Sequence, residues 1–497
     1  MKRRSLFALS ALALRADTST TRLAKANEFR ASALSRMNAE REAIQSSNSD
    51  EIAVPSFGGS YSKGLAHNRQ ALPNPDSYRA YLAAVGAGTL EAYEAVPMGG
   101  QARFACPLGA HTFDSVGLDA CQFAVPPAPA IASAAHAADM VEVYWRALSR
   151  DVPYTEFASR PITQAAAANL ARLPGYQGPD PFSALFRGNT PGDAAGPAIS
   201  QFLWQTIPFG SSSILQRWQS LQHGQDHLTT FDDWFAVANG STRYALAAWR
   251  QQPRYIITPR DLAAYVWKDF SYQAFQNAAL ILIGMGGAVA SPRNPYRTTR
   301  AQAGFVNFGG PMVLDFVARA ANAALRATWF QKWQVHRRAR PEETAARLQA
   351  GSIGVHPDLA QNEVLAAIRD RYGSVVLPMA YPEGCPLHPS YPGGHSAIAG
   401  ACVTVLKVLF NPAAIIPSAI VPDEAGHSLR LWTGVPLTVG GELDKLASNM
   451  TFGRDDAGVH YRTDGIAGLK LGEQVAISML RDLFPALPEG VAPAELA

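Results

Sequence analysis

The chain has 497 residues, of which 47% are hydrophobic and 17% are charged, and its formal net charge is +3. This balance is typical of a globular protein with a sizeable core. A nearly neutral chain without a long basic block is a poor nucleic-acid binder, so that class of partner is excluded. Any strong anion site must therefore come from a few lysines and arginines that lie close together.

The first fifty residues are expected to be a tail or arm, followed by a single domain over residues 51–497. The start, MKRRSLFALSALALRADTS, resembles a weak export signal of the twin-arginine type through Arg3 and Arg4; the alternative is a tail that stays on the protein. Residues 20–50 are charged and helix-prone, and predict an arm packed on the body or on a neighbouring subunit. The most apolar segment, 277–290, is shorter than the ~20 residues of a membrane span, so we expect a soluble protein, with export to the periplasm or beyond left open.

Apolar residues recur at three- and four-residue steps in several segments, a spacing that predicts amphipathic helices. In chain order these segments are Asp76–Val96, Ala135–Arg150, Phe231–Arg250, Pro259–Ile283, Pro311–Val335, Pro357–Tyr372 and Ile466–Leu483. Alternating strand patterns are scarce, and no strand–helix–strand unit stands out. The expected fold class is therefore all-α, with helical bundles joined by long connections rich in proline and glycine.

The four cysteines are Cys106, Cys121, Cys385 and Cys402. None forms a CxxC pair, so a zinc cluster is not expected. Cys106 and Cys121 bracket a short polar loop. A disulfide between them and two free thiols both remain open, because spacing alone does not fix the geometry.

A first basic cluster, KWQVHRRARP, follows the segment predicted as a helix over Pro311–Val335. Lys332 and Arg340 are eight residues apart, just over two helical turns, so both side chains can lean toward one site. Pro341 then ends or bends the helix. The alternative is a solvated basic face at the C-terminal end of a helix.

A second cluster, HPSYPGGHS, runs from His388 to Ser396 and leads into a strongly apolar helix that starts near His395. The free backbone N–H groups at such a helix start suit an anion. Glycines at Gly393 and Gly394 allow a ligand to approach the backbone closely. An ordinary turn before a buried helix is the alternative.

A third cluster contains Arg454, His460 and Asp464 in the segment GRDDAGVHYRTDG. His460 and Asp464 are four residues apart, so on a helix they share a face and Asp464 can orient the imidazole. Arg454 can offer a forked contact to an oxyanion. A structural His–Asp pair is the alternative, because the spacing alone is not specific.

Together the clusters read Lys-x7-Arg-Pro, then Pro-x-Gly-His, then Arg-x5-His-x3-Asp. This order resembles the signature of the superfamily of type-2 phosphatidic acid phosphatases and vanadium haloperoxidases. The closer detail, KWQVHRRARPEE, HPSYPGGH and GRDDAGVHYRTDG, is similar to the algal and bacterial bromoperoxidase branch. The similarity extends upstream to GLAHN at 64–68 and ADMVEVYWRALSRDVPYTEF at 138–157. It implies two four-helix bundles with the active-site motifs within 332–465.

The resemblance also implies a vanadate cofactor and no haem. Calcium, which some relatives bind through clustered acidic oxygens, is not expected because the segment SPRNPYRTTR at 291–300 is basic. His460 matches the family's only protein ligand to the metal. Lys332, Arg340 and Arg454 match the groups that neutralise the vanadate oxygens, and the backbone N–H of Gly394 matches a further donor. A preorganised ring of cations and amides of this kind binds a tetrahedral oxyanion.

Two more histidines acquire roles from the resemblance. His395 matches the acid–base histidine that helps hydrogen peroxide enter the site, and Lys332 is expected to polarise the bound peroxide. His388 matches a second histidine that favours bromide and iodide over chloride; a loop histidine with a structural hydrogen bond is the alternative.

One position departs from the family pattern. The usual turn is Pro-Ser-Gly-His, in which the serine hydroxyl contacts a vanadate oxygen, and Gly393 stands in the place of that serine. The missing hydrogen bond to a charged group is expected to cost ~1.5–3 kcal/mol of binding unless a water replaces it.

The expected function is a vanadate-dependent haloperoxidase, in which hydrogen peroxide oxidises bromide or iodide to hypohalous acid that halogenates a small organic substrate. The resemblance implies a homo-oligomer, a dimer or larger. Two alternatives stay open. One is a phosphomonoesterase that forms a phosphohistidine at His460 with His395 as the acid, and the other is a non-catalytic oxyanion-binding homologue.

Overall fold

The structure is a computed structural model that describes residues 5–490, with side chains from residue 21 onward. The arginine pair of the expected export signal, Arg3 and Arg4, lies outside the described residues. The helices are α1 (Ser5–Ala39), α2 (Asp50–Ala53), α3 (Pro75–Ala87), α4 (Leu90–Glu94), α5 (Ala134–Ser149), α6 (Pro161–Leu170), α7 (Pro181–Ala184), α8 (Phe231–Ala238), α9 (Pro259–Lys268), α10 (Gln273–Met285), α11 (Gly310–Phe330), α12 (Pro341–Ala350), α13 (Pro357–Ala360), α14 (Glu363–Tyr372), α15 (Gly394–Leu409), α16 (Val439–Asp456) and α17 (Arg462–Leu483).

Strands are rare in the described chain. β1 (Ile207–Phe209) pairs antiparallel with β2 (Ser212–Ile214), and β3 (Ile420–Pro422) pairs antiparallel with β4 (Leu429–Leu431). The prediction of an all-α fold is confirmed.

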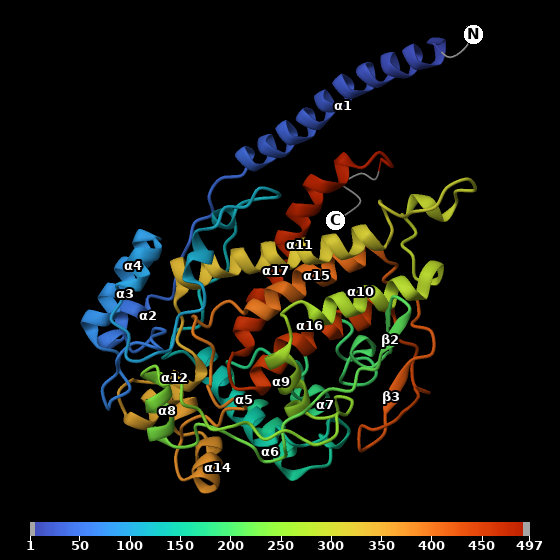
Figure 1. Ribbon diagram of the computed structural model, residues 1–497. Coiled ribbons are helices and arrows are strands. Elements are labelled where there is room, and N and C mark those ends of the chain that lie inside the picture. Colours follow the sequence, from blue (N-terminus) through green and yellow to red (C-terminus); the bar gives the residue numbers. More distant parts are fainter. Residues whose placement is uncertain (1–4, 491–497) are drawn as a thin grey trace.

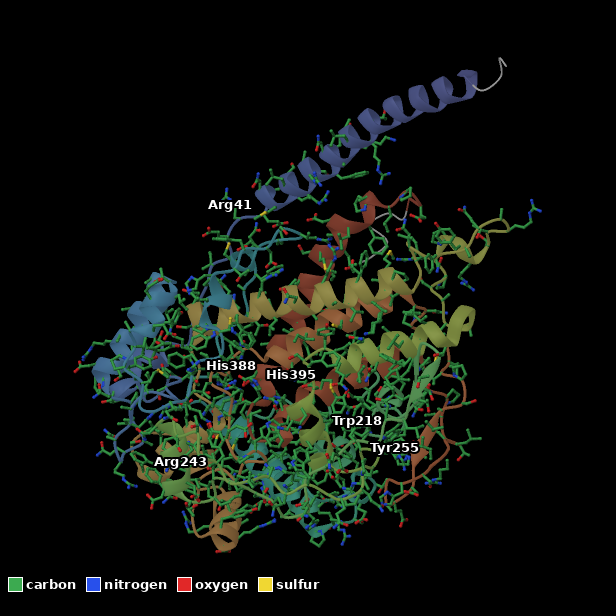
Figure 2. The ribbon with its side chains drawn as sticks, viewed as in Figure 1. Arg41, Trp218, Arg243, Tyr255, His388 and His395 are labelled. Carbon is green, nitrogen blue, oxygen red and sulfur yellow. The ribbon has the colours of Figure 1, made fainter. Side chains whose placement is uncertain are left out.

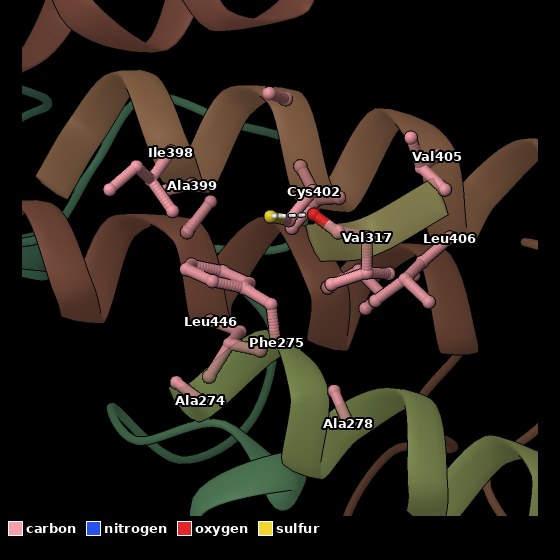
Figure 3. Close-up of a cluster of buried hydrophobic side chains, with 14 of the residues drawn as sticks. Ala274, Phe275, Ala278, Val317, Ile398, Ala399, Cys402, Val405, Leu406 and Leu446 are labelled. Atoms are coloured by element: carbon pink, nitrogen blue, oxygen red, sulfur yellow. Dashed lines mark hydrogen bonds between the residues drawn. The ribbon is translucent and has the colours of Figure 1, made fainter. Parts of the chain in front are cut away.

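The larger hydrophobic core surrounds α15, which packs against α11, α16 and α17 (Figure 1). Figure 3 shows part of this core, where Phe275 of α10, Val317 of α11 and Leu446 of α16 surround the buried face of α15. The long apolar run that follows His395 in the sequence is therefore buried nearly all round, as a central bundle helix requires.

Glycines let α15 and α17 approach each other closely. A Cβ on Gly472 of α17 would lie 1.9 Å from the Ala397 carbonyl oxygen, and one on Gly400 of α15 would lie 2.1 Å from the Leu469 carbonyl oxygen. Neither position tolerates a side chain unless the helices separate. This contact matters for function because the first residues of both helices lie beside the candidate site.

A second core gathers around α5, which packs on α6, α13 and α14. The two cores are joined by buried ion pairs. Glu142 of α5 accepts hydrogen bonds from Arg146 Nη2 at 2.8 Å and from Arg462 Nε at 2.7 Å, which ties α5 to the start of α17. Burial alone would raise the pKa of Glu142, but the two arginines lower it to about 2.

Several helix predictions were right and others too long. Ala135–Arg150 and Ile466–Leu483 match α5 and α17, and Pro311–Val335 matches α11 with a π-helical turn over Gln331–His336. The other predictions need correction. Asp76–Val96 breaks at Gly88, Phe231–Arg250 ends at Ala238, Pro259–Ile283 breaks at 269–272, and Pro357–Tyr372 breaks at 361–362.

Left-handed backbone accounts for three of these corrections. Gly88, Gly240 and Ser271 have φ of 64°, 81° and 55°, which an α-helix cannot contain. Asn362 instead caps α14 by accepting the Val364 N–H.

The arm predicted over residues 20–50 contains the end of α1, which leaves the body as a long helix (Figure 1). Its last turn is tied down by an ion pair between Arg36 and Asp482 of α17, 2.8 Å long. Beyond this turn Leu23 and Leu34 are 61% and 57% exposed. Among the described residues no helix combines the length and hydrophobicity of a membrane span. Cys106 and Cys121 are free thiols.

Candidate active site

The second and third sequence clusters line one cavity of about 370 Å³, and Arg340 of the first cluster contacts two residues of its wall, His388 and His460. Five predicted site residues line it, namely His388, Gly394, His395, Arg454 and His460. Aromatic side chains of Trp267, Trp329 and Tyr381 complete much of its wall. Figure 2 shows His388 and His395 near each other below α11. The cavity therefore combines histidine nitrogens, a guanidinium and the start of a helix.

His460 is held by Asp464, as predicted, although the local structure differs from the prediction. His460 is not helical: it precedes Tyr461, the N-cap of α17, while Asp464 lies in the first turn of that helix. The Nδ1 atom of His460 lies 2.8 Å from Asp464 Oδ2. Because a carboxylate only accepts hydrogen bonds, Nδ1 carries the proton and Nε2 keeps its lone pair.

The Nε2 atom of His460 faces Arg340, whose Nη1 lies 2.9 Å away. A guanidinium only donates, so both neighbours assign the same tautomer. Burial, followed by Arg340, lowers the pKa of His460 well below its ordinary value. His460 is therefore a neutral imidazole with a lone pair at Nε2, the form in which histidine binds a metal.

Lys332 and Arg340 do approach one site, but the predicted reason is wrong. They do not share a helix, because α11 passes into the π-helical turn and the chain then reverses at Arg337, whose φ is 41°. Arg340 is the N-cap of α12, in extended backbone. Pro341 accordingly starts a new helix. It does not bend the old one.

Neither cation lines the cavity, but Arg340 contacts His388 and His460, which do. Lys332 Nζ donates to the carbonyl oxygens of Pro389 and Ser390 at 2.7 and 2.6 Å. Arg340 Nε donates to the carbonyl of His388 at 2.9 Å. Burial, reinforced by Arg340, lowers the pKa of Lys332 well below its ordinary value. An anion beside these groups would offset that cost.

His395, at the start of α15, faces a carboxylate that sequence reasoning missed. Its Nε2 lies 3.0 Å from Asp269 Oδ1, and the Asp269 side chain is only 2% exposed. Burial alone would raise the pKa of Asp269, but His395 and then Arg454 bring it below its ordinary value. Asp269 follows α9, far from every motif, and nothing in the local sequence marks it.

Arg454 of α16 and His388 complete the cavity wall. Arg454 Nη1 donates to the carbonyl of Val266 at 2.6 Å, while its Nε is buried without a hydrogen-bond partner. Such an orphaned donor costs free energy unless a ligand satisfies it. His388 packs on Trp329, with ring centroids 4.7 Å apart, and its Nδ1 lies 3.0 Å from Arg340 Nη2.

The two glycines of the turn have different places. Gly394 lines the cavity as the first residue of α15, so its N–H has no partner within the helix. Gly393 is the N-cap of α15 and is not among the residues that line the cavity; its N–H donates to the Asp464 carbonyl at 2.8 Å. A Cβ on Gly393 would lie 2.7 Å from Ser396 Oγ.

The chain was compared with known proteins. A model of the VCPO second helical-bundle domain matches residues 313–484. A vanadium-dependent bromoperoxidase of Ascophyllum nodosum is 34% identical over 454 residues, which cover 84% of this chain and 81% of that protein. A vanadium-dependent bromoperoxidase of Corallina pilulifera is 32% identical over 525 residues, which cover 86% of this chain and 88% of that protein.

The fold has a close structural counterpart. The homohexameric structure of the second vanadate-dependent bromoperoxidase of Ascophyllum nodosum superimposes with a TM-score of 0.90, at 28% sequence identity. The match covers 95% of this chain and 86% of that chain. The similarity therefore extends well beyond the three motifs and includes the upstream region.

Proposed function

Because the chain belongs to the family of vanadium-dependent bromoperoxidases, we propose that it oxidises bromide or iodide with hydrogen peroxide, in a reaction that depends on bound vanadate. The product is hypohalous acid, which halogenates small organic molecules. The observation that carries the proposal is the lone pair of His460 Nε2, which Asp464 and Arg340 assign, at a cavity that Arg454 also lines.

The residues present fit a tetrahedral oxyanion. The unpaired Nε of Arg454, the N–H of Gly394 and the buried ammonium of Lys332 are donors or positive charges that an anion would satisfy. We assign His460 Nε2 as the protein ligand to vanadium, with Lys332, Arg340 and Arg454 as the neutralising charges. Vanadate in that place supplies a Lewis acid that makes hydrogen peroxide electrophilic toward a halide.

The proton chemistry falls to His395. Its Nε2 is engaged by Asp269, which leaves Nδ1 as the ring atom that exchanges protons with the entering peroxide and the departing water. His388, on the cavity wall beside Arg340, is the residue we assign to halide preference. Asp464 acts through His460 by fixing its tautomer.

The proposal is tested with the vanadate-free protein, orthovanadate, bromide, hydrogen peroxide and a diketone dye whose bromination is followed by absorbance. Bromination that appears only with vanadate supports it. Hydrolysis of a phosphoester that vanadate inhibits, without bromination, would identify a phosphatase instead. Vanadate binding with neither activity would identify a binding protein.

Gly393 allows a direct test of the missing serine. We expect Gly393→Ser to tighten vanadate binding about tenfold or more, which corresponds to the ~1.5–3 kcal/mol of a hydrogen bond to a charged group. The Ser396 hydroxyl must turn aside to admit the new Cβ. Gly393→Ala adds the same Cβ without the hydroxyl, so the difference between the two dissociation constants isolates the hydrogen bond. Equal constants would refute this account of position 393.

We also propose that the protein is a homo-oligomer in which α1 contacts another copy. A relative of the same fold is homohexameric, and α1 projects from the body with Leu23 and Leu34 exposed. Apolar side chains on a projecting helix indicate a protein partner.

The double variant Leu23→Glu/Leu34→Glu is therefore expected to form a smaller assembly, as measured by light scattering after size-exclusion chromatography. Arg79→Glu, on the exposed surface of α3, serves as the control for added negative charge. An unchanged mass for the double variant would contradict the role of α1.

A further inference from the structure

One sequence feature has no place in the proposed mechanism, namely the upstream segment ADMVEVYWRAL. Its Asp139 lies on α5 and is 4% exposed, far in sequence from the three motifs. The structure nevertheless brings Asp139 to the edge of the candidate site. Its Oδ2 accepts a hydrogen bond from Arg338 Nη2 at 3.1 Å, and Thr463 Oγ1 also donates to it.

Arg338 connects this carboxylate to the one that orients His460. Its Nη1 donates to Asp464 Oδ1 at 2.8 Å, and its Nη2 donates to Asp139 Oδ2 at 3.1 Å. Its guanidinium carbon lies 3.9 Å from the centroid of the Tyr461 ring. The two carboxylates therefore fix the direction in which the Arg338 guanidinium points, and the Tyr461 ring fixes the plane of the guanidinium.

The backbone of Arg338 also supports the second motif. Its carbonyl oxygen accepts the N–H of Ser390 at 3.0 Å. Ser390 Oγ in turn donates to Asp464 Oδ2 at 2.6 Å, the same oxygen that faces His460 Nδ1. Both oxygens of Asp464 are therefore restrained, one by the side chain of Arg338 and the other by a residue that its backbone positions.

We propose that Arg338, anchored by Asp139, is a positioning residue that fixes the Asp464 carboxylate and, through it, the orientation of the His460 imidazole. Without the Arg338 guanidinium, the buried carboxylate would lose its cation and the partner of Oδ1, and it would be held only through Oδ2. The hydrogen bond that keeps the proton on His460 Nδ1 would then weaken. This role rests on the proposed function, because it concerns the ligand that would hold vanadium.

The test compares two neighbouring arginines. Arg337, the preceding residue, has a side chain that is 14% exposed, and its Nε donates to Glu51 Oε1 at 2.7 Å. We expect Arg338→Gln to raise the dissociation constant for orthovanadate by up to ~10–100-fold, the usual cost of losing the outer partner of a metal ligand, because Arg338 acts on His460 through Asp464. Arg338→Lys, which keeps the charge but loses the fork, should fall in between. Arg337→Gln should stay within about twofold of the wild type, since it removes no contact to Asp464.

A double-variant cycle separates positioning from general destabilisation. On an Asp464→Asn background, Arg338→Gln should add less than about a twofold loss, because its effect passes through Asp464. Vanadate binding at the wild-type constant in Arg338→Gln, or the same loss on both backgrounds, would overturn the proposal.

A second readout needs no vanadate. The ¹⁵N shifts of the His460 imidazole, in protein labelled at histidine and assigned with a His460→Ala sample, report which nitrogen carries the proton. We expect the wild type to show a protonated Nδ1. Arg338→Lys should keep this tautomer, which Arg340 also assigns, but the Nδ1 resonance should shift because its hydrogen bond to Asp464 weakens. If Arg338→Gln does not fold, this comparison decides. If the wild type binds no vanadate, the proposed function fails, and these shifts still test the role of Arg338: an unchanged Nδ1 resonance in Arg338→Lys would refute it.

Discussion

Replacing His460 with alanine is expected to abolish vanadate binding and vanadate-dependent bromination together. Removing an outer partner of a metal ligand typically costs ~10–100-fold in affinity, and His460 supplies the proposed ligand atom itself, so the loss should exceed that range. The three proposed cations would remain and would retain a weak, screened attraction for any oxyanion. Titration calorimetry with orthovanadate measures the loss directly, independently of turnover.

The matched control for His460→Ala is His67→Ala. His67 is another buried histidine, 9% exposed, whose Nε2 lies 2.9 Å from Ser62 Oγ, and it does not line the cavity. The variant removes a buried imidazole of the same size, so it reports the cost of a cavity alone. Vanadate bound equally well by His460→Ala and by His67→Ala would rule out His460 as the ligand.

The residues that touch the oxyanion in our proposal could be found from sequence because each lies in a short motif. His395 follows a Pro/Gly turn at the start of an apolar helix, and His460 has its orienting carboxylate four residues ahead. The predicted contact forms even though His460 is not helical. Asp464, in the first turn of α17, reaches back to His460, which lies just before the N-cap of that helix.

The residues that hold those side chains in place could not be found in this way. Asp269 reaches His395 from a helix end more than a hundred positions earlier, and Asp139 reaches Arg338 from α5. Such contacts depend on how helices pack, which hydrophobic periodicity does not encode. The break at Ser271 shows a further limit of periodicity: the apolar spacing continues across this left-handed residue, whose backbone N–H donates to the Asp269 side chain.

The ionised Asp269 provides the second prediction with a large expected effect. Asp269→Asn is expected to lower kcat for bromination ~100-fold or more, within the ~10²–10⁴ range of general acid–base catalysis, because an amide supplies no negative charge to His395. Vanadate affinity should change much less, since His460 and its partners are untouched. Steady-state bromination rates and calorimetric vanadate titration, measured on the same preparation, separate the two quantities. Asp315→Asn, which breaks the exposed pair with Arg319, controls for loss of a carboxylate elsewhere.

The pH range in which Asp269 supports His395 follows from the direction of the Asp269 pKa shift. Since His395 and Arg454 lower the pKa of Asp269 below its ordinary value of 3.8, the carboxylate is ionised in the folded protein throughout the neutral and mildly acidic range. Its contribution is therefore complete above the ordinary value and is lost only as the pH falls through the lower, folded-state value. Protonation of Asp269 itself should therefore add no pH dependence to the ratio of wild-type to Asp269→Asn rates between pH 5 and pH 8. A ratio that collapses toward one within that interval would show that a different group controls the proton on His395.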